Sequence, residues 1–213
     1  MKTKNLKFCC DFLMQHFWQT KLISMDISSR SFFANEFKEN SLSVVEKNII
    51  KFCPKTRPYR DVNEMDNSMR NDWNATIQPE DMVYILGDVA FNNGARAAQY
   101  VQSLNGRKIL IEGNHDYKNL RDTAFRACFE QVHKYHELRY NGEIIVMFHY
   151  PIHLAWNRAH YGSIHFHGHC HGSKTGLEEY RARDVGFDAT GKIAVELEHM
   201  IADAITGKIA GHH

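Results

Sequence analysis

The sequence lacks the features that mark membrane-spanning or exported proteins. It contains only four prolines and no low-complexity stretch. No apolar run reaches the ~18 residues that a membrane-spanning helix requires. The apolar stretch from Phe8 to Trp18 is interrupted by Asp11, Gln15 and His16, and no small-residue cleavage site follows it. We therefore expect neither a signal peptide nor a membrane partner.

An excess of charge of one sign is also lacking, because 26 Lys and Arg residues face 25 Asp and Glu residues. Such a balance provides no field that would attract a nucleic-acid backbone or an anionic membrane. We expect no nucleic-acid partner, and any phosphate that the protein handles must be attracted locally.

The five cysteines are odd in number, scattered, and form no Cys-x-x-Cys pair. This pattern is typical of a reducing compartment and predicts a cytoplasmic protein. With 213 residues and 43% hydrophobic content, the chain is long enough for one substantial core. Nothing in the pattern indicates an oligomeric state.

Helix and strand patterns alternate in the first part of the chain. Apolar residues at helical spacing predict an amphipathic helix that starts near Asp61 and ends before Pro79. The other elements expected there are a strand at 82–86, a helix at 96–104 ending at Asn105-Gly106, a strand at 108–112, and a third helix in which Leu120, Phe125, Cys128, Phe129 and Val132 share a face.

The second half of the chain has a strand-rich pattern. Asn141-Gly142 between the segments 137–140 and 143–148 is a hairpin signal. Further short strands are expected near 163–167 and 183–187, followed by a helix from Val195 to Ile205. Parallel units followed by antiparallel strands predict an α/β protein with two packed sheets flanked by helices.

Polar residues that can bind a metal follow four of the apolar runs. The four groups are Gly87-Asp88, Gly113-Asn114-His115-Asp116, His149, and Gly168-His169-Cys170-His171. Because ligands bind at the carboxyl ends of strands in open α/β sheets, we expect these groups to converge. The glycines would allow the backbone to turn sharply and approach a metal closely.

The predicted ligands are Asp88, Asn114, His149, His169 and His171. This mixed nitrogen and oxygen set suits Mn, Fe, Zn or Co better than Ca or Mg. In an extended segment His169 and His171 point to the same side, so they could serve two neighbouring ions or hold one, while Cys170 packs away from them. Each residue alone also has an ordinary structural explanation as a turn or a core residue. Their co-occurrence at four strand ends favours a site, and we interpret His165 and His167 only as its neighbours.

The order Gly-Asp, Gly-Asn-His-Asp, His and Gly-His-x-His resembles the calcineurin-like metallophosphoesterases, particularly small bacterial and phage members. The likeness extends from Lys47 to Ile205 and includes flanking segments such as His149-Tyr150-Pro151 and 184–188. The resemblance implies a four-layer α/β/β/α sandwich of two mixed β-sheets flanked by helices.

The resemblance also implies roles for individual residues. Asp88 would bridge two metal ions, His171 would belong to one of them, and Asn114, His149 and His169 would complete the shell of the other. His115 would protonate the leaving oxygen of a small phosphorylated substrate such as a nucleotide, oriented by Asp116. The implied activity is hydrolysis of a phosphomonoester or phosphodiester by a metal-activated water.

The family's Asp-x-His motif on the first strand has no clear counterpart. A gapless comparison places Ser41, Ser43 and Glu46 there, and an alignment with an insertion places Asp26 and Ser28 there, with Leu22 to Asp26 as the first strand. Glu36 and Glu39 are further substitutes. We therefore divide the chain into a divergent segment at 1–46, a metallophosphoesterase domain at 47–207 and a tail at 208–213, with one complete metal-ligand set and one incomplete set.

The incomplete set leaves two alternatives beside an active hydrolase. One is a weakened or inactive family member that serves as a binding or scaffold module. The other is a structural zinc module built on the histidines, which the lack of a Cys-rich ligand set disfavours.

Overall fold

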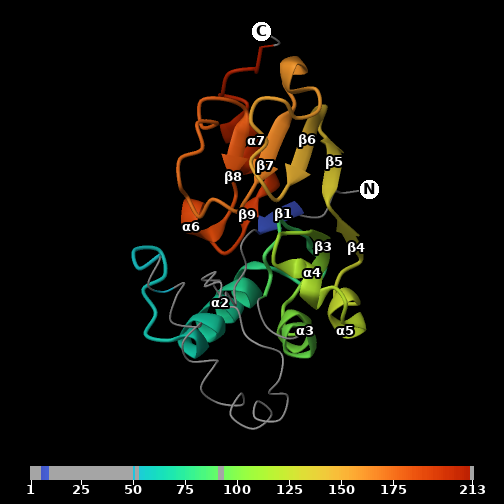
Figure 1. The fold of residues 1–213 in the computed structure, drawn as a ribbon, viewed down its shortest axis with the longest axis vertical. Coiled ribbons are helices and arrows are strands. Elements are labelled where there is room, and N and C mark those ends of the chain that lie inside the picture. Colours follow the sequence, from blue (N-terminus) through green and yellow to red (C-terminus); the bar gives the residue numbers. More distant parts are fainter. Residues whose placement is uncertain (1–5, 10–49, 51–52, 91–93, 212–213) are drawn as a thin grey trace, which may run out of the picture.

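The computed structural model describes residues 6–9, 50, 53–90 and 94–211, and these form an α/β fold with two β-sheets (Figure 1). The first sheet has the order β4-β3-β2-β1-β9. Its strands are β1 (Leu6–Cys9), β2 (Met82–Ile85), β3 (Arg107–Ile111), β4 (Gln131–His133) and β9 (Val195–Glu196). Strands β1 to β4 are parallel, and β9 is antiparallel to β1.

The second sheet has the order β5-β6-β7-β8. Its strands are β5 (Tyr135–Tyr140), β6 (Glu143–Phe148), β7 (Ile164–His167) and β8 (Ala182–Asp184). The hairpin β5–β6 is antiparallel, whereas β6, β7 and β8 are parallel. Asn141 and Gly142 have positive φ angles of 48° and 88°, as the predicted Asn-Gly turn requires.

Helices cover the outer face of the first sheet. They are α2 (Val62–Thr76) and α3 (Gly94–Gln102), followed along the chain by the short α4 (Asp116–Asn119) and α5 (Thr123–Arg126). The Asp61 side chain caps α2 by accepting a hydrogen bond from the Glu64 amide. Met65, Met69 and Trp73 recur at helical spacing and are fully buried with Val83 and Ile85 of β2.

A second core lies between the two sheets. Strand alternation directs Tyr84 and Leu86 to the face opposite Val83 and Ile85. There they join a cluster with Ile109 and Ile111 of the first sheet and Ile145, Met147, Ile164 and Phe166 of the second. The helix α7 (Leu197–Ala204) contributes Leu197 and Ala204 to the same cluster.

The outer face of the second sheet is covered differently. Val146 and Ala182 pack there against Trp156, Ala159 and Leu177. The covering residues come from loops and from the 3₁₀ turn η1 (Ala159–Tyr161). No helix within the described ranges is long and apolar enough to cross a membrane.

Several predicted elements have different boundaries in the structure. The third helix is two short helices, α4 and α5, and Val132 belongs to strand β4 instead. The strand expected near 183–187 ends at Asp184 and is followed by helix α6 (Phe187–Thr190). The predicted helix that starts at Val195 instead begins at Leu197, after the two-residue strand β9.

Four residues of the N-terminal segment 1–46 are described by the structure. Strand β1, from the segment set apart as divergent, lies inside the first sheet between β2 and β9. The alternative first strand at 22–26 lies outside the described residues.

Candidate metal centre

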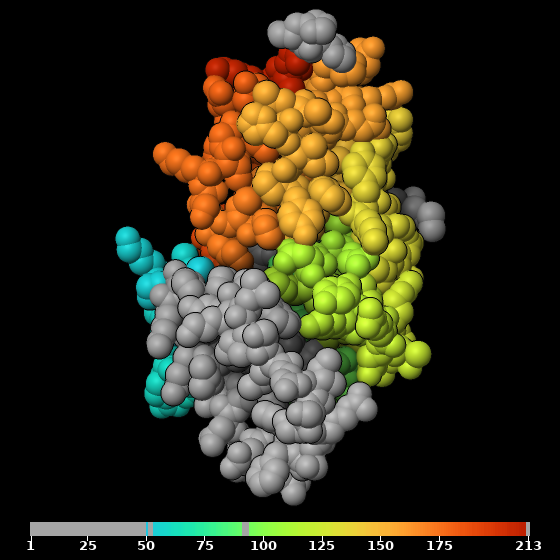
Figure 2. Space-filling model, in the orientation of Figure 1, coloured from blue at the N-terminus to red at the C-terminus, as the bar shows by residue number. Residues whose placement is uncertain are grey.

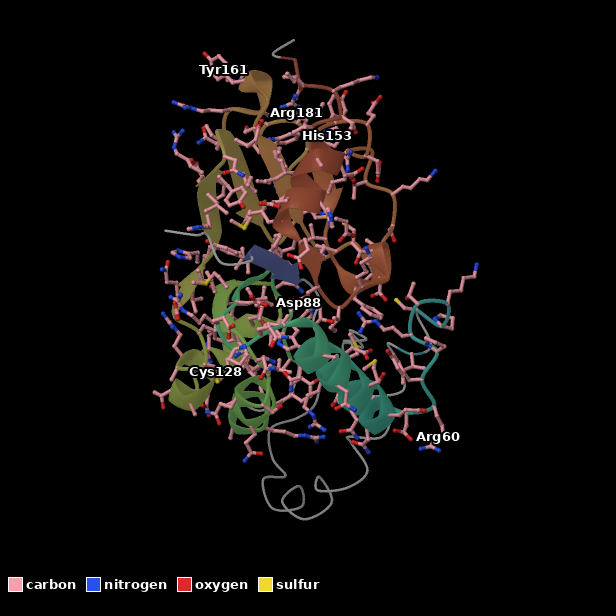
Figure 3. The ribbon with its side chains drawn as sticks, turned by 180° about the vertical axis from the view of Figure 1, so that it is seen from behind. Arg60, Asp88, Cys128, His153, Tyr161 and Arg181 are labelled. Atoms are coloured by element: carbon pink, nitrogen blue, oxygen red, sulfur yellow. The ribbon has the colours of Figure 1, made fainter. Side chains whose placement is uncertain are left out.

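The carboxyl ends of strands from both sheets meet near the middle of the molecule. Figure 3 places Asp88 there, and Figure 2 shows the lime-coloured part of the chain after β3 meeting the orange part at mid-height. Ligand atoms of Asp88, His149 and His169 lie within 4.8 Å of one another. The structure thus brings together three of the predicted ligands, from the ends of β2, β6 and β7.

His149 presents one particular ring nitrogen to this cluster. Its Nδ1 lies 2.7 Å from the carbonyl oxygen of Leu86, and because a carbonyl only accepts, Nδ1 carries the proton. A neutral imidazole in this tautomer has its lone pair on Nε2. That Nε2 lies 3.0 Å from Asn114 Oδ1 and 3.3 Å from Asp88 Oδ2. The backbone of β2 thus orients a histidine of the second sheet as a metal ligand.

His169 completes this group from a strained loop. Its ring centroid is 5.1 Å from that of His149, and its side chain is exposed, whereas Asp88 and His149 are buried. Its φ angle is +68°, and those of Asp88 and His171 are +55° and +47°. Non-glycine residues with positive φ cost energy and are concentrated at functional sites. The segment after β7 is therefore a turn, not the extended segment expected from the His-x-His spacing.

Two glycines allow the loops after β2 and β3 to approach each other. A Cβ atom on Gly87 would lie 2.5 Å from His149 Nδ1 and 2.7 Å from the Gly113 backbone, and the φ angle of Gly87 is +91°. A Cβ atom on Gly113 would overlap Asp88 Oδ1 and would lie 2.5 Å from the Asp88 amide nitrogen. No larger residue fits at either position without moving a ligand.

Asp116 holds these loops together. It is fully buried, and its carboxylate accepts hydrogen bonds of 2.8 Å from the amides of Asp88, Val89 and Gly113. Burial and the nearby Asp88 charge raise the pKa of Asp116 to about 6, although the three amides oppose this change. The resemblance gave Asp116 the role of orienting the His115 ring. In the structure both carboxylate oxygens bind the backbone.

His115 lies half-buried beside the ligand set, and its amide donates to Asp88 Oδ1 over 3.0 Å. Burial lowers the pKa of the His115 ring, and the nearby His149 and His171 lower it further. The Asp88 charge raises this pKa but does not outweigh them. Burial raises the pKa of Asp88, but its contacts with His149 and with the His115 amide outweigh burial, so the net pKa is lowered. Asp88 is thus held as an anion in the middle of the cluster.

His171 belongs to a second cluster that the sequence reasoning did not foresee. Its Nδ1 lies 2.8 Å from Asp188 Oδ2, and Cys53 Sγ is within 4.8 Å of both ligand atoms. Arg57 binds the same carboxylate. Burial raises the pKa of the Cys53 thiol, and the Asp188 charge adds to this effect. Burial raises the pKa of Asp188, but His171, Arg57 and Thr56 outweigh it and hold the pKa well below its usual range. The only sequence signal for Asp188 was its place in the family-like segment 184–188.

The neighbouring histidines are not among the residues of either cluster. His165 faces the outer side of the second sheet, where its ring contacts the Val146 carbonyl and accepts from the Ile152 amide. His167 is buried beside the Gly168 carbonyl. The proposed substitutes for the first-strand motif lie outside the described residues; they are Asp26, Ser28, Glu36, Glu39, Ser41, Ser43 and Glu46.

Comparisons with known proteins give relatives in sequence and in fold, and no family model matches the chain. An uncharacterized protein of Methanocaldococcus jannaschii is 32% identical over 135 residues, which are 62% of this chain and 66% of that protein. The matched region is thus just under two thirds of the archaeal relative's length. The Gene 66 protein of Mycobacterium phage L5 is 28% identical over 161 residues, covering 62% of this chain and 78% of the phage protein.

A solved structure shares the fold. The crystal structure of a protein of unknown function from Aquifex aeolicus superposes with a TM-score of 0.62 and 19% sequence identity. The superposition covers 93% of this chain and 98% of the other. At this level of identity the likeness concerns the arrangement of sheets and helices alone.

Proposed function

We propose that the protein is a metal-dependent phosphoesterase of the calcineurin-like type, acting on a small phosphomonoester or phosphodiester such as a nucleotide. The observation that carries this proposal is the convergence of Asp88, Asn114 and His149, with Nε2 of His149 fixed as a lone-pair donor by Leu86. The two packed sheets, with α2 and α3 outside the first, support the corresponding sandwich fold.

The residues present fit a divalent transition metal. Asp88 provides a carboxylate oxygen, Asn114 an amide oxygen, and His149 and His169 imidazole nitrogens. Such a mixed set is typical of Mn, Fe, Zn or Co. Bound ions at such a centre supply a nucleophilic hydroxide and polarise the phosphoryl oxygens.

The other residues have roles that follow from their positions. Asp116 keeps the loops after β2 and β3 at the separation that the ligand set requires. His115 lies next to Asp88 and is placed to donate a proton to the leaving oxygen. This role accounts for a histidine that lies beside the ligands without being one of them. Tyr150 is 37% exposed, and its ring centroid lies 4.7 Å from that of His169, so it forms part of the rim that a substrate meets.

A chromogenic bis-aryl phosphate with added Mn²⁺ tests this activity. We expect Mn²⁺-dependent turnover that falls by about 100-fold or more in His115→Asn, the usual contribution of general acid catalysis. The exposed His199 on α7 offers a matched control, because His199→Asn removes a histidine far from the ligand set in sequence and should leave turnover unchanged. Wild-type turnover no faster than that of His115→Asn would reject the proposal.

A binding module without turnover is the second candidate. Among the described residues, His171 groups with Cys53 and Asp188 and not with Asp88, and this departure from the ligand set that the resemblance implies favours a binding module. Tight Mn²⁺ binding without Mn²⁺-dependent hydrolysis would establish this alternative.

A further inference from the structure

We propose that Asp188, held by Arg57, is a positioning residue that fixes the tautomer of His171, so that Nε2 of His171 is the atom offered to a metal ion. The inference deepens the proposed function and rests on it, since a fixed Nε2 lone pair matters only if a cation is bound. The observation behind it is a buried chain of contacts from Arg57 through Asp188 to His171.

The Asp188 carboxylate is surrounded by donors. Arg57 Nε lies 2.9 Å from Oδ1, Arg57 Nη2 lies 2.8 Å from Oδ2, and Thr56 Oγ1 donates to Oδ1 over 2.6 Å. A guanidinium that binds both oxygens requires the carboxylate anion. His171 Nδ1, at 2.8 Å from Oδ2, must therefore be the donor of its hydrogen bond. A neutral His171 ring then has its lone pair on Nε2.

Burial makes this arrangement rigid. The side chain of Arg57 is 0% exposed and that of Asp188 is 1% exposed, whereas His171 is 27% exposed. The contacts thus run from the interior to the partly exposed ring of His171. The loop that carries His171 is tied down at its next residue, where Gly172 N donates to Asp184 Oδ2 over 3.2 Å. A Cβ atom on Gly172 would lie 2.9 Å from the Asp188 carbonyl oxygen, so this loop packs directly on α6.

A metal ion inside the Cys53, His171 and Asp188 triangle is the competing interpretation. Its three ligand atoms are close enough, within 4.8 Å of one another. However, the guanidinium of Arg57 already occupies the same carboxylate, and a second cation there would be repelled at short range in a buried environment. Carboxylate–histidine pairs beside metal sites usually orient the histidine instead of binding the ion.

The first test measures the tautomer in the unmodified full-length chain without metal. Long-range ¹H–¹⁵N correlation spectra of histidine-labelled protein distinguish the two ring nitrogens, and the signal lost in His171→Asn assigns His171. We expect a protonated Nδ1 and an unprotonated Nε2. A protonated Nε2, or a mixture of both tautomers, overturns the inference.

The second test measures Mn²⁺ binding by calorimetric titration. We expect Asp188→Asn to weaken the site that depends on His171 by about 10–100-fold, as loss of a partner behind a metal ligand usually does. Binding at the Asp88, Asn114, His149 and His169 set should be retained. The matched control is Glu130→Gln, whose exposed carboxylate binds Arg107 through both oxygens and belongs to neither ligand cluster. Equal losses in both variants, or no loss in Asp188→Asn, contradict the proposed role.

Two additions keep the outcome decisive. Asp188→Asn leaves Arg57 buried without its counter-ion, so the double variant Arg57→Met with Asp188→Asn removes both charges if the single variant does not fold. A Co²⁺ thiolate charge-transfer band that Cys53→Ser abolishes would place the ion in the triangle and reject the positioning role. Neither test needs turnover, so an inactive protein would sink the proposed function while leaving the tautomer and binding results interpretable.

Discussion

The exchange Gly113→Ala tests whether the close approach of the loops after β2 and β3 is a requirement of the metal centre. The added methyl carbon would lie 2.5 Å from the Asp88 amide nitrogen and would overlap Asp88 Oδ1. Ordinary contacts begin at 3.4 Å, so the two loops must separate by about 1 Å. Rotation of the Asp88 side chain cannot relieve this clash, because the backbone nitrogen is also involved.

Two losses of different kinds follow from this displacement. Forcing one extra carbon into a packed position costs about 1–3 kcal/mol of stability. A shift of about 1 Å at a catalytic ligand costs about 100-fold in rate. We therefore expect a modest loss in chemical unfolding, a marked loss of Mn²⁺ affinity in calorimetric titration, and Mn²⁺-dependent hydrolysis reduced by about two orders of magnitude.

Gly191→Ala provides the control. Gly191 has a φ of +66° with nothing within 4 Å of an added Cβ, so alanine there should cost about 1–2 kcal/mol through backbone strain alone. The two variants should lose comparable stability, but only Gly113→Ala should lose metal affinity. Wild-type Mn²⁺ affinity in Gly113→Ala would refute the reasoning that these loops set the position of Asp88.

Three further predictions concern binding and stability. Mn²⁺ at about 100 times its dissociation constant should stabilise the protein by about 2.7 kcal/mol in thermal unfolding, and a similar gain in His149→Ala would contradict the ligand assignment. Asp116→Asn replaces one of the oxygens that accept three amide hydrogen bonds with a donor, so it should cost about 1–3 kcal/mol in urea unfolding, more than the exposed exchange Asp72→Asn on α2. Burial lowers the pKa of His165 from 6.5 to about 4, so the unfolded chain binds more protons and stability should fall by about 3 kcal/mol from pH 6.5 to pH 4. Unfolding at several pH values checks this, and an unchanged slope in His165→Gln would exclude His165 as the cause.

The sequence allowed the strand-end residues to be found because each ligand follows an apolar run with strand character. Asp88 and His149 lie after β2 and β6 as predicted, and Asn114 lies beside them. The amphipathic pattern predicted α2 well, since its buried face and its Asp61 cap are both local features. These predictions depend only on the order of residues along the chain.

The errors came where distant contacts decide the structure. Nothing local marks Leu6–Cys9 as an interior strand, because its partners Met82–Ile85 and Val195–Glu196 are far along the chain. The pairing of Arg57 with Asp188 spans 131 residues and has no spacing signal. The third helix was overextended because Val132 continues its apolar pattern, although the residue pairs with Leu110 in the sheet.

The place of β1 between β2 and β9 has a consequence for how the protein is made. Phe8 pairs with Tyr84 on one side and with Val195 on the other, so β1 can gain its second neighbour only after Val195 has left the ribosome. Pairings of such long sequence separation slow folding and leave apolar edges open in the meantime. We expect the nascent protein to depend on chaperones until residue 196 has left the ribosome. The first sheet should then form in a single step.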